Sequence, residues 1–400
     1  MSAHPIQAWN LRALAVAEAT FGTTPNPAAA QALELIKLEL GAVEANERRP
    51  KRDRGVGRAM QADWVSGRVM PIDWSLEASV RSRSAADTVP DLNVIYGAAG
   101  LKKTVNTSTS VVYSMVAAPQ ESGDLAPISL QRNLGNPSTA ATSMHEAEVM
   151  RGCIASKLRW SGGDKELTLE ASGKGIGKLT LGSIDSATVA DNSTTSVTIG
   201  ADDSYKLKAG GYMQWESEII QIASVTRGAT SMTVTRGALS STAAAHSAKP
   251  MYPYYPTSGV SFSGSPISEV VSTVTLGGDA YRCLGWGIEL ATGIEHTPGE
   301  TGSAYAQGTV VKRYDLSANL RLLYKGNDVQ LAGYANELST VALSIVQGSG
   351  AGSINTFSLP YCEVVAFAAG APENDVSIID VTLRARDNTT GNDAFTYTLT

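Results

Sequence analysis

Four histidines are the first residues to test for chemistry, because histidine is the usual acid–base group near neutral pH. They are His4, His145, His246 and His296, each in a different segment of the chain. None has a second histidine or a cysteine at a spacing typical of metal sites, and no Gly-x-Ser-x-Gly nucleophile motif occurs. The sequence therefore predicts no catalytic residue, no metal site and no cofactor.

Two further motifs could suggest an active site. The run Gly173–Lys178 (GKGIGK) is similar to a phosphate-binding loop, but Leu179 occupies the position where that loop needs a hydroxyl side chain. We expect a sharp glycine turn between strands there. The acidic pairs Asp202–Asp203 and Glu216–Glu218 could serve glycoside hydrolysis, which needs two carboxylates. Solvated turn and strand faces explain them more simply.

One basic cluster stands out in a segment rich in proline and glycine. It comprises Arg48, Arg49, Lys51, Arg52, Arg54 and Arg58. Three interpretations remain open: the cluster contacts an acidic neighbouring subunit, forms a solvated loop, or binds nucleic acid. The first is favoured, because the rest of the chain is acidic and no aromatic residues are interleaved with the cluster. These six residues are candidates for inter-subunit contacts.

Composition narrows the class of protein. The chain has 400 residues, 43% of them hydrophobic, and a formal net charge of −6, so it can bury a core and has no basic excess for DNA binding. Its three cysteines are too few and too scattered for a disulfide framework, which favours assembly inside a cell. No run reaches the roughly 18 apolar residues of a membrane span, and we expect no membrane association.

The clearest structural element is a hairpin over Arg151–Gly177. Ile154, Leu158 and Trp160 are expected on one face of its first arm, and Leu167, Leu169 and Ala171 on one face of its second. Similar alternation predicts strands over residues 72–81, 110–117, 284–290, 310–324, 341–346, 379–385 and 395–399.

Helices are expected over residues 90–100 and 327–338, where proline or asparagine begins a helical pattern. The fold class is therefore a β-rich α+β fold. Residues 1–60 read as an irregular arm and loop, in which residues 27–40 form a short helical turn that leads into a strand. Residues 61–179 and 258–400 read as two parts of one domain. Residues 180–257, rich in serine and threonine, read as an inserted small β-domain that includes one hairpin with Val225 and Val234 on its two arms.

Several segments in a fixed order resemble the tail tube proteins of long-tailed bacteriophages. They are Glu18–Pro25 (EATFGTTP) with Ala28–Ala32, Arg48–Gly57, Met70–Trp74 (MPIDW), Val89–Leu92 (VPDL), the hairpin over Gly152–Gly173, and the strand–helix–strand ending. The resemblance covers roughly residues 10–178 and 258–400.

The resemblance implies a structural virion protein with a barrel-forming β-sandwich fold and no catalysis. Six copies would form a ring, and stacked rings would form the tail tube, joined by long loops such as 42–60 and 296–308. Tape measure, tail terminator and distal tail proteins would be partners. The protein would assemble in the host cytoplasm, and DNA would pass through the lumen without specific binding.

A function of another class remains open beside this one. The aromatic residues around Trp215 and in Met251–Tyr255 (MYPYY) are typical of carbohydrate-binding or adhesin-like β-modules. Exposed stacking rings would favour that function, and buried rings would favour the tube. In a tube, the 180–257 insertion would have to project outward.

Overall fold

The computed structural model describes most of the chain. The described residues are 11–23, 25–28, 31–42, 70–116, 119, 123–135, 144–163, 166–256, 264–268, 272–297, 305–306, 308–323, 329–337, 339–369, 378–387 and 394–400. They form a β-rich fold with two short helices, α1 (Asn93–Ala98) and α2 (Val329–Glu337), so the predicted fold class is confirmed. Both helices lie within the ranges that the sequence predicts.

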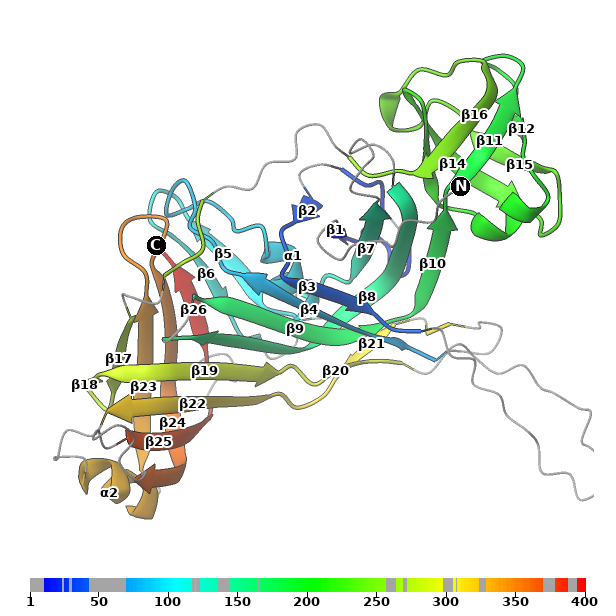
Figure 1. The fold of residues 1–400 in the computed structure, drawn as a ribbon. Helices are drawn as coiled ribbons and strands as arrows, with labels where there is room; N and C mark the ends of the chain where they lie inside the picture. Colours follow the sequence, from blue (N-terminus) through cyan, green and yellow to red (C-terminus); the bar gives the residue numbers. More distant parts are fainter. Residues whose placement is uncertain are drawn as a thin grey trace, which may run out of the picture.

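The body of the molecule is one hydrogen-bonded network of 18 strands that folds into several layers (Figure 1). We call its widest part the long sheet. In order of pairing it contains β3 (Lys37–Leu40), β4 (Ile72–Ser79), β9 (Thr168–Gly175), β8 (Met144–Gly162), β19 (Cys283–Ala291), β22 (Asp315–Leu323), β25 (Ile378–Ala385) and β24 (Asn355–Ala369). All of these pairs are antiparallel.

Two further sheets continue from the long one. The facing sheet contains β5 (Lys102–Asn106), β6 (Ser110–Ser114), β26 (Thr396–Leu399), the first part of β24, β23 (Thr340–Gln347), β17 (Ser272–Leu276) and β18 (Asp279–Tyr281). The side sheet contains β2 (Ala32–Leu33), β1 (Leu11–Ala17), β7 (Ile128–Gly135), the first part of β8 and β10 (Gly177–Gly182). A separate small hairpin joins β20 (Ile294–His296) to β21 (Thr309–Val311).

An aromatic cluster fills the space between the long sheet and the facing sheet, whose strands cross steeply in Figure 1. Trp160 on β8 contacts the rings of Phe357 on β24 and Tyr397 on β26, and the last two stack with centroids 4.5 Å apart. Tyr96 of α1 joins them at 6.0 Å from Trp160. All four are fully buried, so this cluster ties helix and sheets into one core.

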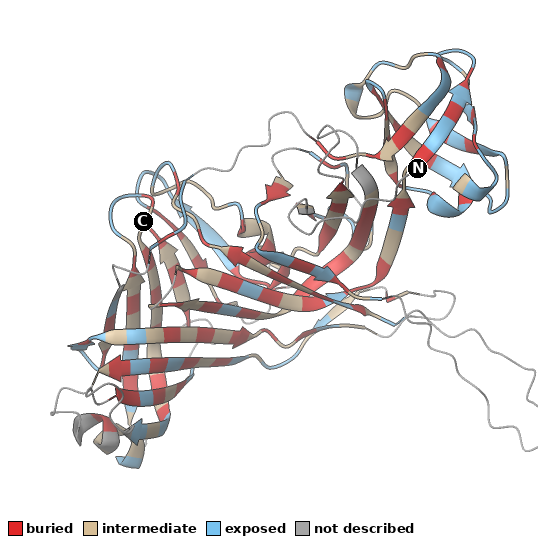
Figure 2. Cartoon of the chain, in the orientation of Figure 1, coloured by how far each residue is buried: buried red, intermediate tan, exposed pale blue. Residues whose placement is uncertain are grey.

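The expected alternation holds along most strands, as the regular change from buried to exposed residues in Figure 2 shows. On β4, for example, Ile72, Trp74, Leu76 and Ala78 are all at most 3% exposed, and their neighbours face outward. Such strands were identifiable from sequence because only one of their faces is covered.

The hairpin of β8 and β9 forms as predicted, but the face assigned to Ile154 is wrong. Ser156 is an extra residue between two paired positions of β8, a β-bulge. The bulge reverses the alternation, so that Ala155 joins Leu158 and Trp160 in the main core, whereas Ile154 lies outside that core cluster. A pattern of period two cannot reveal where one residue is inserted.

The arm predicted over residues 1–60 is more regular than expected, because residues 11–17 form β1 between β2 and β7. Ala13, Leu14, Ala15 and Val16 are all buried, so both faces of the strand are covered and no alternation marks it. The strand expected near the end of residues 27–40 is present as β3.

Residues 184–253 form a closed barrel that stands apart from the sheets at the end of β10 (Figure 1). Its strands in pairing order are β11 (Ile184–Val189), β12 (Ser196–Thr198), β15 (Ser231–Thr235), β14 (Glu218–Val225), β13 (Tyr212–Trp215) and β16 (His246–Pro253). β14 and β15 are the two arms of the predicted hairpin. The barrel has its own hydrophobic core, to which the body contributes only Ala147, Leu179 and Leu181.

Candidate functional site

The six basic candidates for inter-subunit contact, Arg48, Arg49, Lys51, Arg52, Arg54 and Arg58, lie outside the described residues. The structure therefore places none of them. The features below come from the described part of the chain.

The outer face of the long sheet carries rows of exposed charged side chains that pair across neighbouring strands. The pairs are Lys157–Glu289 at 2.8 Å, Arg159–Glu170 at 3.6 Å, Lys174–Asp73 at 3.7 Å and Arg384–Asp315 at 3.0 Å. Each joins one cation to one anion, so their charges cancel. Exposed pairs contribute only about 0–1 kcal/mol each, so their main effect is on the surface potential and not on stability.

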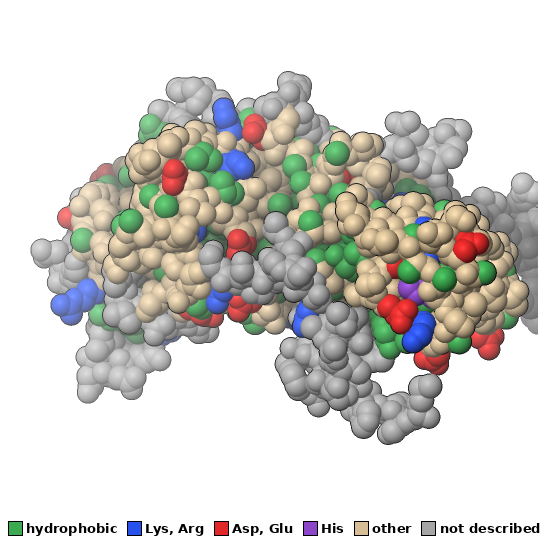
Figure 3. Space-filling model, turned by 90° about the horizontal axis from the view of Figure 1, so that it is seen from above, with side chains coloured by type: hydrophobic (Ala, Val, Ile, Leu, Met, Phe, Trp, Pro, Cys, Tyr) green, Lys and Arg blue, Asp and Glu red, His purple; other side chains and the backbone are tan. Residues whose placement is uncertain are grey.

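Figure 3 shows that both acidic and basic side chains are present on the face of the molecule seen from above. A polyanion such as DNA binds through many unopposed cations, and its affinity rises with each phosphate that a cation neutralises. The outer face of the long sheet is polar, and its cations are paired with anions.

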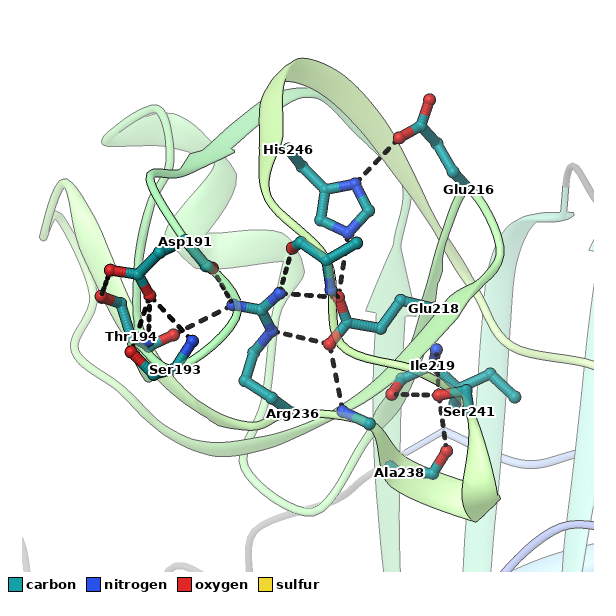
Figure 4. Close-up of polar contacts among 12 residues, drawn as sticks. Asp191, Ser193, Thr194, Glu216, Glu218, Ile219, Arg236, Ala238, Ser241 and His246 are labelled. Atoms are coloured by element: carbon teal, nitrogen blue, oxygen red, sulfur yellow. Dashed lines mark hydrogen bonds and ion pairs between the residues drawn. The ribbon is translucent and has the colours of Figure 1, made fainter.

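A second feature lies at one end of the small barrel, where four ionisable side chains meet (Figure 4). We call Glu216, Glu218, Arg236 and His246 the barrel cluster. The Arg236 guanidinium donates two hydrogen bonds to the Glu218 carboxylate, at 2.6 and 2.7 Å. The His246 ring contacts Glu218 through Nε2 at 2.9 Å and Glu216 through Nδ1 at 2.8 Å.

Backbone groups from the β11–β12 and β15–β16 turns complete this network, and Glu216 comes from the β13–β14 turn. Arg236 also donates to the carbonyl oxygens of Asp191, Thr194 and Ala244, and Glu218 accepts the backbone N–H groups of Gly237 and Ala244. The cluster thus fastens the β11–β12, β13–β14 and β15–β16 turns to one another.

Glu218 is fully buried, which corrects the expectation that it lies on a solvated strand face. Burial disfavours its charged form, but the hydrogen bonds from Arg236, His246 and the two backbone N–H groups prevail and lower its pKa to about 2. The position of Glu218 within its strand is the sequence feature that indicates this burial. Glu218 is two and four residues from the buried Ile220 and Ile222, so strand alternation places all three on the same face.

The barrel cluster is structural, although a histidine between two carboxylates could in principle transfer protons. Both Glu218 oxygens are engaged by Arg236, and the carboxylate is closed to solvent. Strained backbone surrounds the network, because Glu216, Leu239, Ser240 and Ala248 have positive φ angles between 50° and 64°. Non-glycine residues keep such angles only where their surroundings hold them firmly.

Of the aromatic residues that suggested carbohydrate binding, Trp215 and Tyr255 are buried, whereas Tyr252 and Tyr254 are half-buried. Trp215 and Met251 are fully buried in the barrel core, and Trp215 stacks on His246 at 4.2 Å. Tyr255 is 4% exposed and packs with Leu14 of the body. Carbohydrate binding by stacking needs exposed rings, and these buried rings do not form such a surface.

His296 and two of the cysteines in the described part of the chain lie enclosed in the protein. Within the described ranges, no three His, Cys, Asp or Glu residues are grouped as metal ligands. His296 is largely enclosed, donates from Nε2 to the Lys174 carbonyl and has a pKa lowered by burial. Cys153 and Cys362 are free and buried, and loss of hydration raises both thiol pKa values. Buried neutral thiols are unreactive.

Neither described helix is long and apolar enough to cross a membrane. No protein-family model matches the chain, and none of the curated proteins compared with it shows significant sequence similarity.

Proposed function

We propose that this chain is a structural subunit of a bacteriophage tail tube, in which six copies form a ring and the rings stack into a conduit for DNA. The observation that carries the proposal is the long sheet. One of its faces packs on the core, and the other presents charges that cancel in pairs. A channel wall for DNA needs such a face, because unopposed cations would hold the phosphates.

The two ends of the long sheet support assembly. Among the described residues, β3 pairs only with β4, and residues 364–369 of β24 pair only with β25. Val365 in that edge is 61% exposed. Open sheet edges bind other edges, and a ring of copies joined edge to edge closes the sheet into a barrel and leaves no edge open.

The remaining parts of the proposal follow from the resemblance. The basic segment from Arg48 to Arg58 would contact acidic surface of a neighbouring copy, and tape measure, terminator and distal tail proteins would bind the finished tube. The virion tail would be its location. A carbohydrate-binding or adhesin-like module is less well supported as the main function, because Trp215 and Tyr255 are buried.

Expression of the chain alone, followed by negative-stain electron microscopy and sedimentation, tests the proposal. We expect rings or tubes with a central hole. Val365→Asp should abolish them, because it adds a charge at an edge that would be covered in the ring. Tyr205→Asp is the matched control, since Tyr205 is also exposed, at 63%, but lies in the small barrel outside the long sheet.

Two results would contradict the proposal. One is a wild-type chain that stays monomeric at all concentrations, including after addition of preformed tail tips as initiator. The other is assembly that Val365→Asp and Tyr205→Asp impair equally. Replacement of the six basic residues between Arg48 and Arg58 by glutamine should leave single rings and prevent stacking.

A further inference from the structure

A pocket lies between the small barrel and the body. It has a volume of about 390 Å³, within the roughly 300–1,000 Å³ range of small-molecule sites. The body contributes Arg151 of β8 and Lys178 of β10, and the barrel side contributes Lys208, Tyr212 and Gln221. Tyr254, just beyond β16, and Tyr305 complete the polar lining.

The charges around this junction pocket all have the same sign. Arg151, Lys178 and Lys208 line it, and no acidic side chain does. Lys178 is neutralised by Glu148 at 2.6 Å. Arg151 lies over the Tyr305 ring at 5.2 Å, and neither it nor Lys208 has a carboxylate partner in the described part of the chain. In an acidic protein, two unopposed cations at one cavity favour an anionic ligand.

The rest of the lining is suited to a ring that bears hydroxyl groups. Tyr212 and Tyr254 are half-buried rings in the lining, and Gln221 offers an amide. The Tyr212 hydroxyl donates to the side-chain oxygen of Asn26 and can still accept a hydrogen bond. Leu179 and Leu181 provide apolar surface beside them. Sugars present apolar C–H faces to aromatic rings and hydroxyls to amides and phenols, so this lining matches a saccharide.

We propose that the junction pocket binds an acidic saccharide unit, a sugar ring that carries a carboxylate or a phosphate. Arg151 and Lys208 bind the anionic group, and the tyrosines contact the ring. The anion can come from a uronic acid or from a sugar phosphate, since both offer oxygens to the same two cations. The proposal does not depend on the tail tube function, because the pocket is complete within one chain.

Isothermal titration of the full-length chain tests this with four probes: glucuronate, glucose 6-phosphate, glucose and inorganic phosphate. We expect at least one acidic sugar to bind and glucose to bind at least about tenfold more weakly, since a charge-assisted hydrogen bond contributes about 1.5–3 kcal/mol. Glucuronate alone would identify a carboxylate ligand, and glucose 6-phosphate alone a phosphate ligand.

Variants locate the site. Arg151→Gln and Lys208→Gln should each weaken binding of the acidic sugar about tenfold or more. Lys249→Gln is the matched control, because Lys249 is an exposed barrel lysine paired with Glu216 and does not line the pocket. Circular dichroism checks that each variant is folded, and Lys208→Gln keeps the test valid should Arg151→Gln unfold, since Lys208 lies outside the strands.

Four outcomes would overturn the proposal. These are no heat with either acidic sugar, equal affinity for glucose and glucuronate, binding of inorganic phosphate without binding of either acidic sugar, and equal effects of Lys208→Gln and Lys249→Gln. Each can occur with or without tube formation, so failure here is distinct from failure of the tail tube proposal.

Discussion

Glu218 shows how a single residue can stabilise a whole module. Its charge is buried, and its partners come from the β15–β16 connection, which supplies Arg236, Gly237 and Ala244, and from His246 on β16. Breaking a buried ion pair from one side is far more costly than losing an exposed pair, because the remaining charge stays in a poorly hydrated place.

Glu218→Gln should therefore destabilise the barrel by about 3–5 kcal/mol, since it leaves the Arg236 cation buried without its partner. Hydrogen exchange measured on peptides from β14 and β22 of the full chain is the test, and protection should fall in β14 only. Glu170→Gln is the control, an acid of an exposed pair with Arg159, and should change neither. Equal protection of β14 in Glu218→Gln and wild type would contradict the structural role of the cluster.

Glu218→Gln should also change how the stability of the barrel depends on pH. The pKa of Glu218 is about 2 when folded and about 4.3 in an unfolded chain, so its charge adds stability above the unfolded value. That contribution is lost as pH falls from about 4.3 to about 2. Protection of β14 in the wild type should decline over this window, and the part of the decline due to Glu218 should be absent in Glu218→Gln.

At the scale of elements, strand contacts set strict limits on side-chain size. β8 and β9 lie close together beside the bulge at Ser156, where Gly173 is opposite Ala155. A Cβ atom on Gly173 would lie 1.8 Å from the Ile154 carbonyl oxygen, a backbone atom that cannot turn aside. Glycine is required there because the two strands leave no room for a Cβ atom, and not because the backbone needs a positive φ angle.

Gly173→Ala should thus destabilise the body by at least about 1–3 kcal/mol, the usual cost of overpacking. Gly333→Ala in α2 is the matched control, because nothing lies within 4 Å of its added Cβ and alanine favours helix over glycine by about 1 kcal/mol. Urea unfolding of both variants would show opposite shifts of the midpoint. A Gly173→Ala protein as stable as wild type would mean that β8 and β9 are farther apart than described.

At the scale of the whole molecule, the barrel and the body are nearly separate units. Each has its own hydrophobic core, and the body lends the barrel core only three side chains. The chain enters the barrel after β10 and leaves it after β16, and Figure 1 shows the barrel clear of the long sheet.

Replacement of residues 184–253 by a short Gly/Ser linker should leave the body folded, because its core loses no member of the aromatic cluster. Under the proposed function, the shortened chain should still form rings, with less mass on their outside in electron micrographs. A body that unfolds on excision, or rings that no longer form, would show that the barrel is needed for more than decoration. Acidic saccharide binding should be lost in either case.

Sequence patterns determined the elements with one covered face, such as β4, β19 and β25, because alternation marks them directly. They also predicted α1 and α2, from Pro90 and Gly100 around the first and from Asn327 before the second. They could not reveal β1, which is covered on both faces, or β24, whose Pro360 argues against a strand and lies where its register with β23 shifts.

What only the tertiary structure decided is which distant residues meet. The approach of Glu218, Arg236 and His246, and the junction pocket of Arg151, Lys208 and Tyr254, depend on barrel closure and on where the barrel stands against the body. Strand alternation in the sequence indicates that Glu218 lies on the buried face of β14, but it does not indicate which residues Glu218 contacts. Periodicity records which face of a strand is covered, whereas contacts between strands depend on register, bulges and topology, which leave no local mark in the sequence.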